Sequence, residues 1–339
     1  MKFLKIQKKN AEKKIKELKE KKIIDKQYKV ESLEKHVLIP IKKNKIKEVK
    51  GKIIEKKGKK VKKIPRLKEE LLKVLTKKEM KIFHYKSFDV IGNIIQIMIP
   101  KELKKKEKMI GEAFLKCIPN SRVIVKKVSE TTGVERVRRV KVIAGEKRTQ
   151  TIHVENDCKY KLNLNKVFFT GRLSNERLRI IKQVKKNEIV YDLFCGVGPY
   201  AIPIAKKCKK VVANDINEHA IHYLKENLKL NKIKNISVYN ENANEFTKEL
   251  VKKEGKPSRI IMNLPKTSEL FLNAMIKLSE KNTIIHYYTF WGKDKKNKLE
   301  GIRIAFKKNN KKYKILGIHK CGDYAPGVGR YCVDIKVLN

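Results

Sequence analysis

Two glycines close behind an acidic residue form the first candidate site in the sequence. In the segment EIVYDLFCGVGPYAI, a hydrophobic run ends at Asp192, and Gly196 and Gly198 come before a segment with a helical pattern. Glycines let a backbone approach a ligand closely at the head of a sheet, where doubly wound folds bind their cofactors. The acid suits the cationic amino acid end of S-adenosylmethionine, and Pro199 at a first helical position leaves less open helix terminus for a pyrophosphate. The segment therefore favours S-adenosylmethionine over a dinucleotide.

Acidic and amide side chains follow the next two predicted strands. The segment VVANDIN ends near Asp215, about 20 residues after the glycines, where a carboxylate can accept hydrogen bonds from ribose hydroxyls. Asp215 is also a candidate N-cap for the helix that starts near Glu218, and the two roles can coexist. Asn242 and Ala243 are candidates to flank an adenine, although a plain loop fits that pattern nearly as well.

A further candidate is the amide of Asn263 in RIIMNLPK, where another predicted strand ends. Such an amide can hold a planar nucleobase beside a methyl donor, and Pro265 limits how the chain turns away. A strand terminus followed by a proline turn explains the same residues equally well.

These side chains must meet at one edge of a sheet, and the pattern of the C-terminal half predicts that sheet. Strands are expected at residues 188–194, 209–215, 235–239, 258–263, 283–290, 312–319 and 330–337, with helices between the first six. Strands separated by helical crossovers form a parallel sheet with helices on both faces. Only the short loop CGDYAPGVG separates the last two strands, so those two are expected to be antiparallel. The predicted fold class is α/β, a Rossmann-like methyltransferase domain of seven strands with an antiparallel last strand, preceded by α+β RNA-binding domains.

The front half of the chain has different and more basic patterns. Residues 10–22 have the pattern of a short charged helix, and strand-like segments follow around residues 28–41. The lysine-dense stretch 42–63 indicates a basic hairpin or linker with little core. An α+β pattern follows, with strands expected at 90–100, 121–128 and 135–145 and a helix at 101–117.

The charge balance points to a polyanionic partner. The 339 residues include 85 Lys+Arg and 36 Asp+Glu, a formal net charge of +49. An excess spread along the chain creates a long-range field that attracts nucleic acid and releases its counterions on binding. Solvated surface lysine is the alternative, because the magnitude of the charge does not separate the two. Nucleic acid is therefore the first partner to consider.

Cysteine usage and hydropathy indicate a cytoplasmic protein. The six cysteines form no CxxC pair and lie in apolar surroundings, which favours reduced packing thiols over disulfides or a zinc site. Lysines follow the first residues where a signal peptide would have an apolar stretch. No run approaches the roughly 18 apolar residues of a membrane span. We therefore expect a soluble, cytoplasmic protein that has no membrane partner.

Several segments together resemble the tRNA (guanine-37-N1)-methyltransferases of archaea and eukaryotes. They are VERVRRVKVIAGEKRTQTIHVENDCKYKLNLNKVFFTGRLSNERLRI, YDLFCGVGPY, NDINEHAIHYLKENLKLNKI, IMNLP, IIHYYTF and YAPGVGRYCVDIKV. The likeness extends from about residue 87 to the end, and NAEKKIKELKEKKIIDKQYKV resembles the small N-terminal domain of the archaeal members. FFTGRL departs from the family, which usually has a serine and a proline before the arginine.

The resemblance implies an enzyme that transfers a methyl group from S-adenosylmethionine, without a metal, to N1 of guanosine 37 in tRNA, and so supports reading-frame maintenance. We expect three domains. These are a small basic tRNA-binding domain at 1–65, an α+β middle domain at 66–165 that contributes to tRNA binding and the active site, and a Rossmann-like methyltransferase domain at 166–339. An enzyme that wraps one tRNA needs no second subunit, so we expect a monomer.

The family's catalytic residues are carried over to Arg136, Glu176 and Asn263, each of which lies in a matching motif. Guanine N1 carries a proton at neutral pH, and Glu176 is the candidate base that removes it. Arg136 is the candidate to stabilise the charge that develops on guanine O6. Glu176 could instead be a first-turn carboxylate that the helix dipole favours, and Arg136 a phosphate contact like Arg138 and Arg139. The candidate cofactor-binding residues are Arg177, Asp192, Phe194, Gly196, Gly198, Pro199, Asp215, Ile216, Asn242, Ala243 and Asn263.

Three alternatives remain open from the sequence. A wybutosine-pathway sibling of the same fold would transfer the aminocarboxypropyl group of the same cofactor, or methylate a tricyclic guanosine derivative. A non-catalytic tRNA-binding protein would keep the basic surface but has no need for Asp192, Asp215 and Glu176 together. An NAD-dependent oxidoreductase would carry a similar glycine loop.

Overall fold

The computed structural model describes residues 1–60, 64–128, 137, 139–244, 247–292 and 295–339. The chain divides into two compact units, Met1–Pro65 and Arg66–Asn339, and each unit has a hydrophobic core of its own. None of the helices in the described ranges is both long enough and apolar enough to cross a membrane.

The first unit is a four-stranded antiparallel sheet with one helix packed on it. In spatial order its strands are β2 (Glu31–Ser32), β3 (His36–Pro40), β1 (Lys2–Gln7) and β4 (Lys52–Glu55). The 3-10 helices η1 (Lys8–Asn10) and η2 (Lys43–Glu48) lie between these elements. Helix α1 (Ala11–Glu20) buries Leu18 in a cluster with Leu4 and Ile39 of the sheet.

One sequence expectation is wrong in this unit, and one strand was missed. Strand β1 was not predicted, and residues 42–63 were predicted as a hairpin or linker with little core. Lys52–Glu55 instead forms the edge strand beside β1, with Ile54 opposite Phe3. Lysines interrupt both apolar patterns, and a pairing between segments about 50 residues apart leaves no local periodic signal.

The second unit begins with a smaller sheet, whose strands in spatial order are β5 (Phe88–Ile91), β6 (Ile94–Ile97), β7 (Val123–Lys127) and β8 (Val140–Gly145). Strands β6 and β7 are parallel, and the other neighbouring pairs are antiparallel. The helices of this part are α2 (Leu67–Leu72), α3 (Lys77–Ile82), η3 (Lys101–Lys106) and α4 (Glu107–Cys117). Helix α4 packs Ile110 and Phe114 against Ile124 of the sheet.

The segment 90–100, predicted as one strand, is a hairpin of two short strands. Gly92 makes the turn with φ +58°, and an added Cβ would lie 2.3 Å from Thr151 Oγ1. Glycine is therefore required here both by the backbone angle and by the closeness of the neighbouring strand. The predicted helix at 101–117 starts as a 3-10 helix and becomes α-helical only at Glu107.

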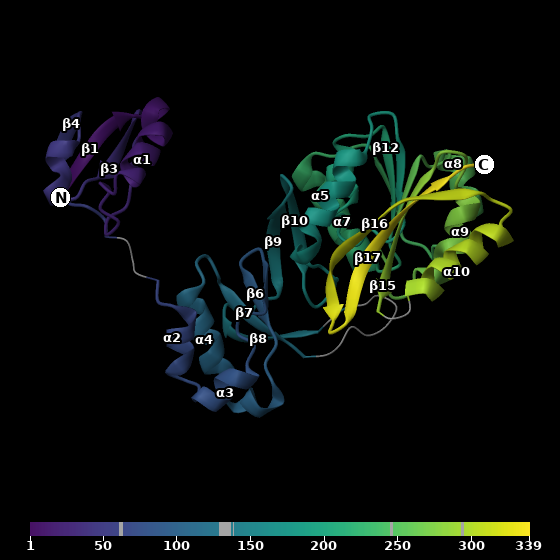
Figure 1. Ribbon diagram of the computed structural model, residues 1–339, viewed down its shortest axis with the longest axis horizontal. Helices are drawn as coiled ribbons and strands as arrows, with labels where there is room; N and C mark the ends of the chain where they lie inside the picture. The colour runs from purple at the N-terminus through teal and green to yellow at the C-terminus, as the bar shows by residue number, and fades with distance from the viewer. Residues whose placement is uncertain (61–63, 129–136, 138, 245–246, 293–294) are drawn as a thin grey trace. The chain divides into compact units, whose positions relative to one another are not determined.

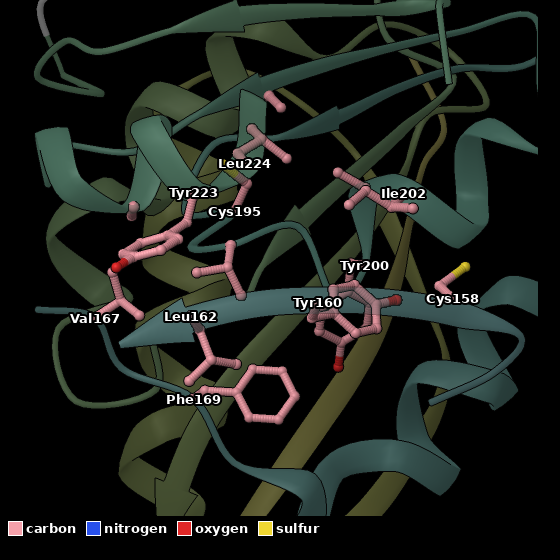
Figure 2. Packing of buried hydrophobic residues seen from close by; sticks show 14 of the residues in the cluster. Cys158, Tyr160, Leu162, Val167, Phe169, Cys195, Tyr200, Ile202, Tyr223 and Leu224 are labelled. Carbon is pink, nitrogen blue, oxygen red and sulfur yellow. The ribbon is translucent and has the colours of Figure 1, made fainter. Parts of the chain in front are cut away.

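A β-hairpin links the smaller sheet to the larger one. Its strands are β9 (Gln150–Glu155) and β10 (Cys158–Asn163), and the two turn residues Asn156 and Asp157 both have positive φ, as a tight hairpin requires. Figure 2 shows Tyr160 and Leu162 of β10 in the same buried cluster as Tyr200 and Tyr223. The hairpin is therefore part of the core of the larger sheet.

The larger sheet has seven strands in the order β13-β12-β11-β14-β15-β17-β16. Their bounds are β11 (Ile189–Asp192), β12 (Lys210–Asn214), β13 (Ile236–Tyr239), β14 (Arg259–Met262), β15 (Ile284–Trp291), β16 (Tyr313–Ala325) and β17 (Val328–Val337). The first five run parallel, and β17 is antiparallel to both β15 and β16. The predicted Rossmann-like class with an antiparallel last strand is confirmed.

The last hairpin is longer than predicted. Residues 321–329 were expected as a loop, but β16 continues to Ala325 and β17 starts at Val328. Three register shifts along β16 let the strand bend while it keeps pairing with β17. Glycines and a proline in this segment gave it the composition of a loop.

Two layers of helices cover the sheet. The helices are α5 (Ser174–Gln183), α6 (Ala201–Ala205), α7 (Glu218–Asn231), α8 (Thr247–Glu254), α9 (Glu269–Leu278) and α10 (Lys295–Lys308), and the 3-10 helix η4 (Gly171–Leu173) precedes α5. Side chains alternate between the faces, so Val190 packs with α5, α6 and α7 while Tyr191 packs with α8, α9 and α10. Figure 1 shows these two layers on opposite sides of the sheet. The layers leave the carboxyl ends of the parallel strands as the place for a ligand.

Candidate active site

A cavity of about 630 Å³ opens at the carboxyl ends of β11, β12 and β14. Nine of the predicted cofactor residues line it, namely Arg177, Phe194, Gly196, Pro199, Asp215, Ile216, Asn242, Ala243 and Asn263. Asp192, Gly198 and Glu176 are not part of the lining. Arg136 lies outside the residues that the structure describes.

Asp215 fixes the glycine loop to the end of the neighbouring strand. Its Oδ2 accepts a hydrogen bond from the Gly196 amide at 2.7 Å, and its Oδ1 accepts one from the Asn217 amide at 3.0 Å. Gly196 has φ +53°, and no atom lies within 4 Å of the place where a Cβ would stand. The loop therefore leaves open space directly above a carboxylate, which suits a ligand that carries hydroxyl groups.

The N-cap of α7 is Asn217, so the alternative that Asp215 caps this helix is wrong. The Asn217 side-chain oxygen accepts hydrogen bonds from the amides of His219 at 2.9 Å and Ala220 at 3.3 Å. Asp215 stands two residues earlier, and its carboxylate turns toward the glycine loop. The cap and the candidate ribose-binding residue are thus two different side chains.

Gly198 serves the packing of α6, and Pro199 lies between this glycine and the helix. Gly198 has φ +91°, and a Cβ there would lie 2.6 Å from Leu224 Cδ1 and 2.9 Å from Ile202 Cδ1. Pro199 is not at the first helical position as predicted, because α6 starts two residues later at Ala201. The two predicted glycines therefore have different tasks, with Gly196 facing the cavity and Gly198 fitting two helices together.

Asp192 is buried beneath the cavity at the end of β11, with 1% of its surface exposed. Burial, together with the nearby Asp215 carboxylate, raises the pKa of Asp192 to about 8, although the Ala201 and Phe194 amides oppose the shift. Neither carboxylate oxygen accepts a hydrogen bond of good geometry from the described residues. Its predicted contact with the cationic end of a ligand is not visible in the lining, and that role stays a prediction.

The ends of β12 and β13 are held together by amide side chains that also place Asn242. Asn214 exchanges two hydrogen bonds with the backbone of Glu241, both at 2.9 Å. The Asn240 side chain donates to the Asp215 carbonyl at 2.7 Å. Asn242 and Ala243 follow directly and line the cavity beside Ile216, an exposed apolar side chain that can cover the face of a flat ring.

Arg177 lines the cavity but is already neutralised. Its Nη1 donates to both carboxylate oxygens of Glu155 at 2.7 Å, and its Nη2 donates to the Thr170 carbonyl at 2.7 Å. The guanidinium also lies over the Phe169 ring, 5.2 Å from its centre. Arg177 therefore fastens α5 to the β9–β10 hairpin. Because its charge is paired with Glu155, it would attract an anionic ligand only weakly.

Glu176 stands one residue earlier on α5 and is held by two donors. Arg179 donates from Nε and Nη2 to its two carboxylate oxygens at 2.7 and 2.8 Å, and the Tyr288 hydroxyl donates to Oε1 at 2.6 Å. Tyr200 in turn donates to Tyr288 at 2.9 Å. These contacts fix the position and direction of the carboxylate, as a base that must meet one particular proton requires.

A buried chain of polar side chains continues from Arg179 to the far end of the sheet. Arg179 donates to both oxygens of Asp334 at 2.6 and 3.2 Å, and His286 Nδ1 lies 2.7 Å from Asp334 Oδ1. Arg259 Nη1 lies 2.6 Å from His286 Nε2 and pairs with Glu188 through its other nitrogens. An arginine only donates, so Nε2 accepts and the proton of the neutral ring sits on Nδ1, facing Asp334.

The pKa values of the groups in this buried chain of polar side chains follow from burial and from pairing between the groups. Burial lowers the pKa of His286, although Asp334 opposes the shift, and Arg259 lowers it again. Burial would raise the pKa of Asp334, but the hydrogen bonds from His286 and Arg179 hold it well below its usual range. The arrangement therefore consists of a neutral histidine between charged groups that balance one another.

His286, Cys332 and Asp334 have ligand atoms within 4.8 Å of one another, close enough to share an ion. Both ring nitrogens of His286 and both oxygens of Asp334 already serve the hydrogen bonds to each other and to arginines. The positive charge that a metal would bring is supplied here by Arg179. We infer that the cluster holds Arg179 in place, and that Arg179 in turn positions the Glu176 carboxylate.

Side chains without a predicted role complete the cavity. They are Phe290, Tyr324 and Arg330, from β15, β16 and β17, together with Phe271 of α9, whose ring meets Phe194 edge to face at 4.9 Å. Tyr324 and Arg330 lie in YAPGVGRYC, a segment that carried part of the family resemblance. The family resemblance of this segment was the only feature of the sequence that pointed to Tyr324 and Arg330. Their position at the cavity depends on the pairing of β15 with β17, which the sequence pattern does not reveal.

Known proteins resemble the chain over most of its length. Residues 151–316 match the TRM5/TYW2 methyltransferase domain, 67–149 the TYW2 N-terminal domain and 4–49 the tRNA methyltransferase 5 N-terminal domain. The tRNA (guanine(37)-N(1))-methyltransferase Trm5b of Pyrococcus abyssi is 38% identical over 317 residues, which cover 93% of this chain and 92% of that protein.

Two solved structures extend the comparison to ligands. A complex of aTrm5 with tRNALeu is 34% identical, with a TM-score of 0.72 and 99% of both chains covered. The structure of TYW2 from M. jannaschii in complex with AdoMet is 25% identical, with a TM-score of 0.57, and the match covers 75% of this chain and 100% of that chain.

Proposed function

The chain belongs to the TRM5/TYW2 methyltransferase family, and we infer that it is a tRNA (guanine(37)-N(1))-methyltransferase. It transfers a methyl group from S-adenosylmethionine to N1 of guanosine 37 in tRNA. The observation that carries this function is the cavity, which brings Asp215, Asn242 and Asn263 to one edge of the sheet. A simple RNA-binding protein has no use for such an assembly.

The residues at the cavity fit S-adenosylmethionine. Gly196 leaves open space above the Asp215 carboxylate, which would accept hydrogen bonds from the ribose hydroxyls. Ile216 and Ala243 would enclose the adenine, with the Asn242 amide at its edge. When bound, S-adenosylmethionine supplies a methyl group that its sulfonium activates toward a nucleophile. Positioning then supplies most of the remaining rate enhancement.

The chain's own residues would prepare the guanine. Asn263 lines the cavity at the end of β14, where its amide would hold the base beside the methyl donor. Glu176 would take the N1 proton, with Arg179 and Tyr288 fixing the direction of its carboxylate. Arg136, outside the described residues, would stabilise the charge that develops on O6.

The substrate must present guanosine 37 outside its stack of bases. The target nucleotide lies in a single-stranded loop, the part of a tRNA that proteins read most readily. The net charge of +49 favours binding of the phosphate backbone and gives an affinity that depends on salt. We propose that the enzyme acts as a monomer and without a metal.

A second candidate is transfer of the aminocarboxypropyl group of the same cofactor. One observation favours it, the match of residues 67–149 to the TYW2 N-terminal domain. The N-terminal match over residues 4–49 to tRNA methyltransferase 5 and the likeness to Trm5b favour methyl transfer.

Mass spectrometry of the product nucleoside separates these two. The full-length protein would be incubated with S-adenosylmethionine and an unmodified tRNA transcript, and the tRNA would then be digested to nucleosides. We expect N1-methylguanosine. Guanosine carrying an aminocarboxypropyl group, or a methyl group on another atom, would contradict the proposed function.

A further inference from the structure

Arg330 is a partly buried cation in the cavity, and it has no ion-pair partner within the described part of the chain. Its Nε is buried without a hydrogen bond, and no carboxylate of a described residue forms an ion pair with its guanidinium. Burial lowers the pKa of Arg330, and the nearby Arg177 lowers it as well, although Tyr200 and Cys321 oppose the shift. A cation taken out of water in this way costs free energy unless a ligand pairs with it.

Arg330 and its aromatic neighbours Phe290 and Tyr324 form a platform in the wall of the cavity. Arg330 lies over the Phe290 ring, 5.4 Å from its centre, and it stands directly opposite Phe290 in the register of β15 and β17. Phe290 stacks on Tyr324 with ring centres 4.0 Å apart. All three line the cavity. Aromatic faces with an arginine are the usual means of holding an unstacked RNA base.

The strand order places this platform on the acceptor side of the cavity. Along the edge, Asp215 follows β12, Asn263 follows β14, and Arg330 lies near the start of β17. Strand β17 is antiparallel, so its start shares the edge with the carboxyl ends of the parallel strands. Asn263 therefore separates the nucleoside end at Asp215 from the half of the cavity that contains Arg330.

Arg330 also lies near the candidate base. Tyr288 donates to Glu176 at 2.6 Å, and Tyr288 and Cys321 are both close enough to Arg330 to act on its charge. The N1 and O6 atoms of guanine are adjacent on one edge of the ring. A base at N1 and a cation at O6 must therefore lie close together, and Tyr288 lies near both Glu176 and Arg330.

We propose that Arg330 binds the target guanine, donating hydrogen bonds to its O6 and N7 atoms. This inference rests on the proposed function. The planar guanidinium fork fits these two acceptors, which adenine does not offer as a pair. Negative charge grows on O6 as N1 loses its proton, so Arg330 shares with Arg136 the task of stabilising the reacting guanine. These two contacts would make Arg330 both a specificity-determining and a catalytic residue.

The test compares Arg330→Gln, Arg330→Lys and the wild type in full-length protein, with Arg303→Gln as the control. Arg303 is an exposed arginine of α10 that pairs with Glu300, away from the cavity. Single-turnover methyl transfer at saturating tRNA and S-adenosylmethionine should fall about 100-fold in Arg330→Gln. Arg330→Lys should recover only part of the loss, and Arg303→Gln should match the wild type. Unchanged S-adenosylmethionine affinity in Arg330→Gln would show that the variant is folded.

A transcript with 7-deazaguanosine at position 37 reports on the contact itself, because it lacks the N7 acceptor. The wild type should methylate this transcript at least about fivefold more slowly than the guanosine transcript. Arg330→Gln should methylate the two transcripts at equal rates. Equal sensitivity of both proteins to the missing N7 would overturn the proposal. The proposal would also be overturned if Arg330→Gln lost affinity for S-adenosylmethionine but not for 5′-methylthioadenosine, which lacks the amino acid end. That result would show that Arg330 binds the carboxylate of the cofactor. A wild type without activity on either transcript would instead refute the proposed function.

Discussion

Glu176 offers the sharpest test at the scale of a residue. Both of its carboxylate oxygens accept hydrogen bonds from Arg179, and Glu176→Gln keeps the size of the side chain but cannot take a proton at neutral pH. Single-turnover methyl transfer should fall about 100-fold to 10,000-fold while both ligands still bind.

The matched control is Glu218→Gln, which removes an exposed first-turn carboxylate from α7. If Glu176 served only the dipole of its own helix, the two glutamine variants would behave alike. Equal rates for Glu176→Gln and Glu218→Gln would therefore remove Glu176 as the base.

The sequence could bring predicted site residues together where strand ends meet. Asp215, Asn242 and Asn263 each follow a strand of the parallel sheet, and parallel strands bring such residues to one edge whatever their distance in sequence. Roles that depend on a pairing far along the chain left no pattern. Arg179 meets Asp334 across 155 positions, and Arg330 reaches the cavity only because β17 lies beside β15.

At the scale of elements, the two glycines of the loop should respond oppositely to alanine. Gly198→Ala adds a Cβ 2.6 Å from Leu224 at a φ of +91°, so it should lower the free energy of unfolding by about 1–3 kcal/mol. Gly196→Ala has open space and should cost less stability, but its methyl group enters the cavity and should weaken S-adenosylmethionine binding. Chemical denaturation and equilibrium titration measure the two effects. The reverse ranking in stability would contradict the assigned tasks.

The buried polar chain behind the sheet should make the protein sensitive to acid. The pKa of His286 in the folded protein is lowered from 6.5, so the unfolded chain binds the proton more readily. Stability from this residue is therefore complete above about pH 6.5 and is lost as the pH falls below it. Asp334, whose pKa is also lowered, acts in the same direction at still lower pH.

Denaturant unfolding between pH 5 and 8 checks this expectation. His286→Gln should be less stable at pH 8 but should lose less further stability on acidification than the wild type. His222→Gln, at an exposed position of α7, should follow the wild-type curve. A wild-type stability that does not fall below pH 6.5 would show that His286 titrates normally.

The success of element prediction depended on the surroundings of each strand. The inner parallel strands of the large sheet are short, mostly apolar runs covered on both faces, such as β14, in which every residue is buried. Strands β1 and β4 belong to a small sheet whose lysines obscure the pattern. The β9–β10 hairpin follows the alternation of a strand, yet only its packing on Tyr200 shows that it belongs with the methyltransferase sheet. We therefore propose that the catalytic module starts near residue 150.

At the scale of the whole molecule, the first unit should contribute affinity for tRNA and not chemistry. Residues 1–65 contain 25 lysines and eight acidic residues, and they have a hydrophobic core of their own. Deleting them should leave S-adenosylmethionine affinity unchanged, lower tRNA affinity, and reduce the slope of log affinity against log salt. Filter binding at several salt concentrations measures that slope. An unchanged slope would mean that this unit does not contact the phosphate backbone.

The central claim is that this cavity methylates guanosine 37 of tRNA, and the most direct measurement changes only that base. Single-turnover methyl transfer from labelled S-adenosylmethionine would be followed on two unmodified transcripts, one with guanosine and one with adenosine at position 37. We predict transfer of one methyl group to the guanosine transcript and none to the other, because adenine has neither the N1 proton that Glu176 takes nor the O6 on which charge develops. Equal methylation of both transcripts would contradict the account.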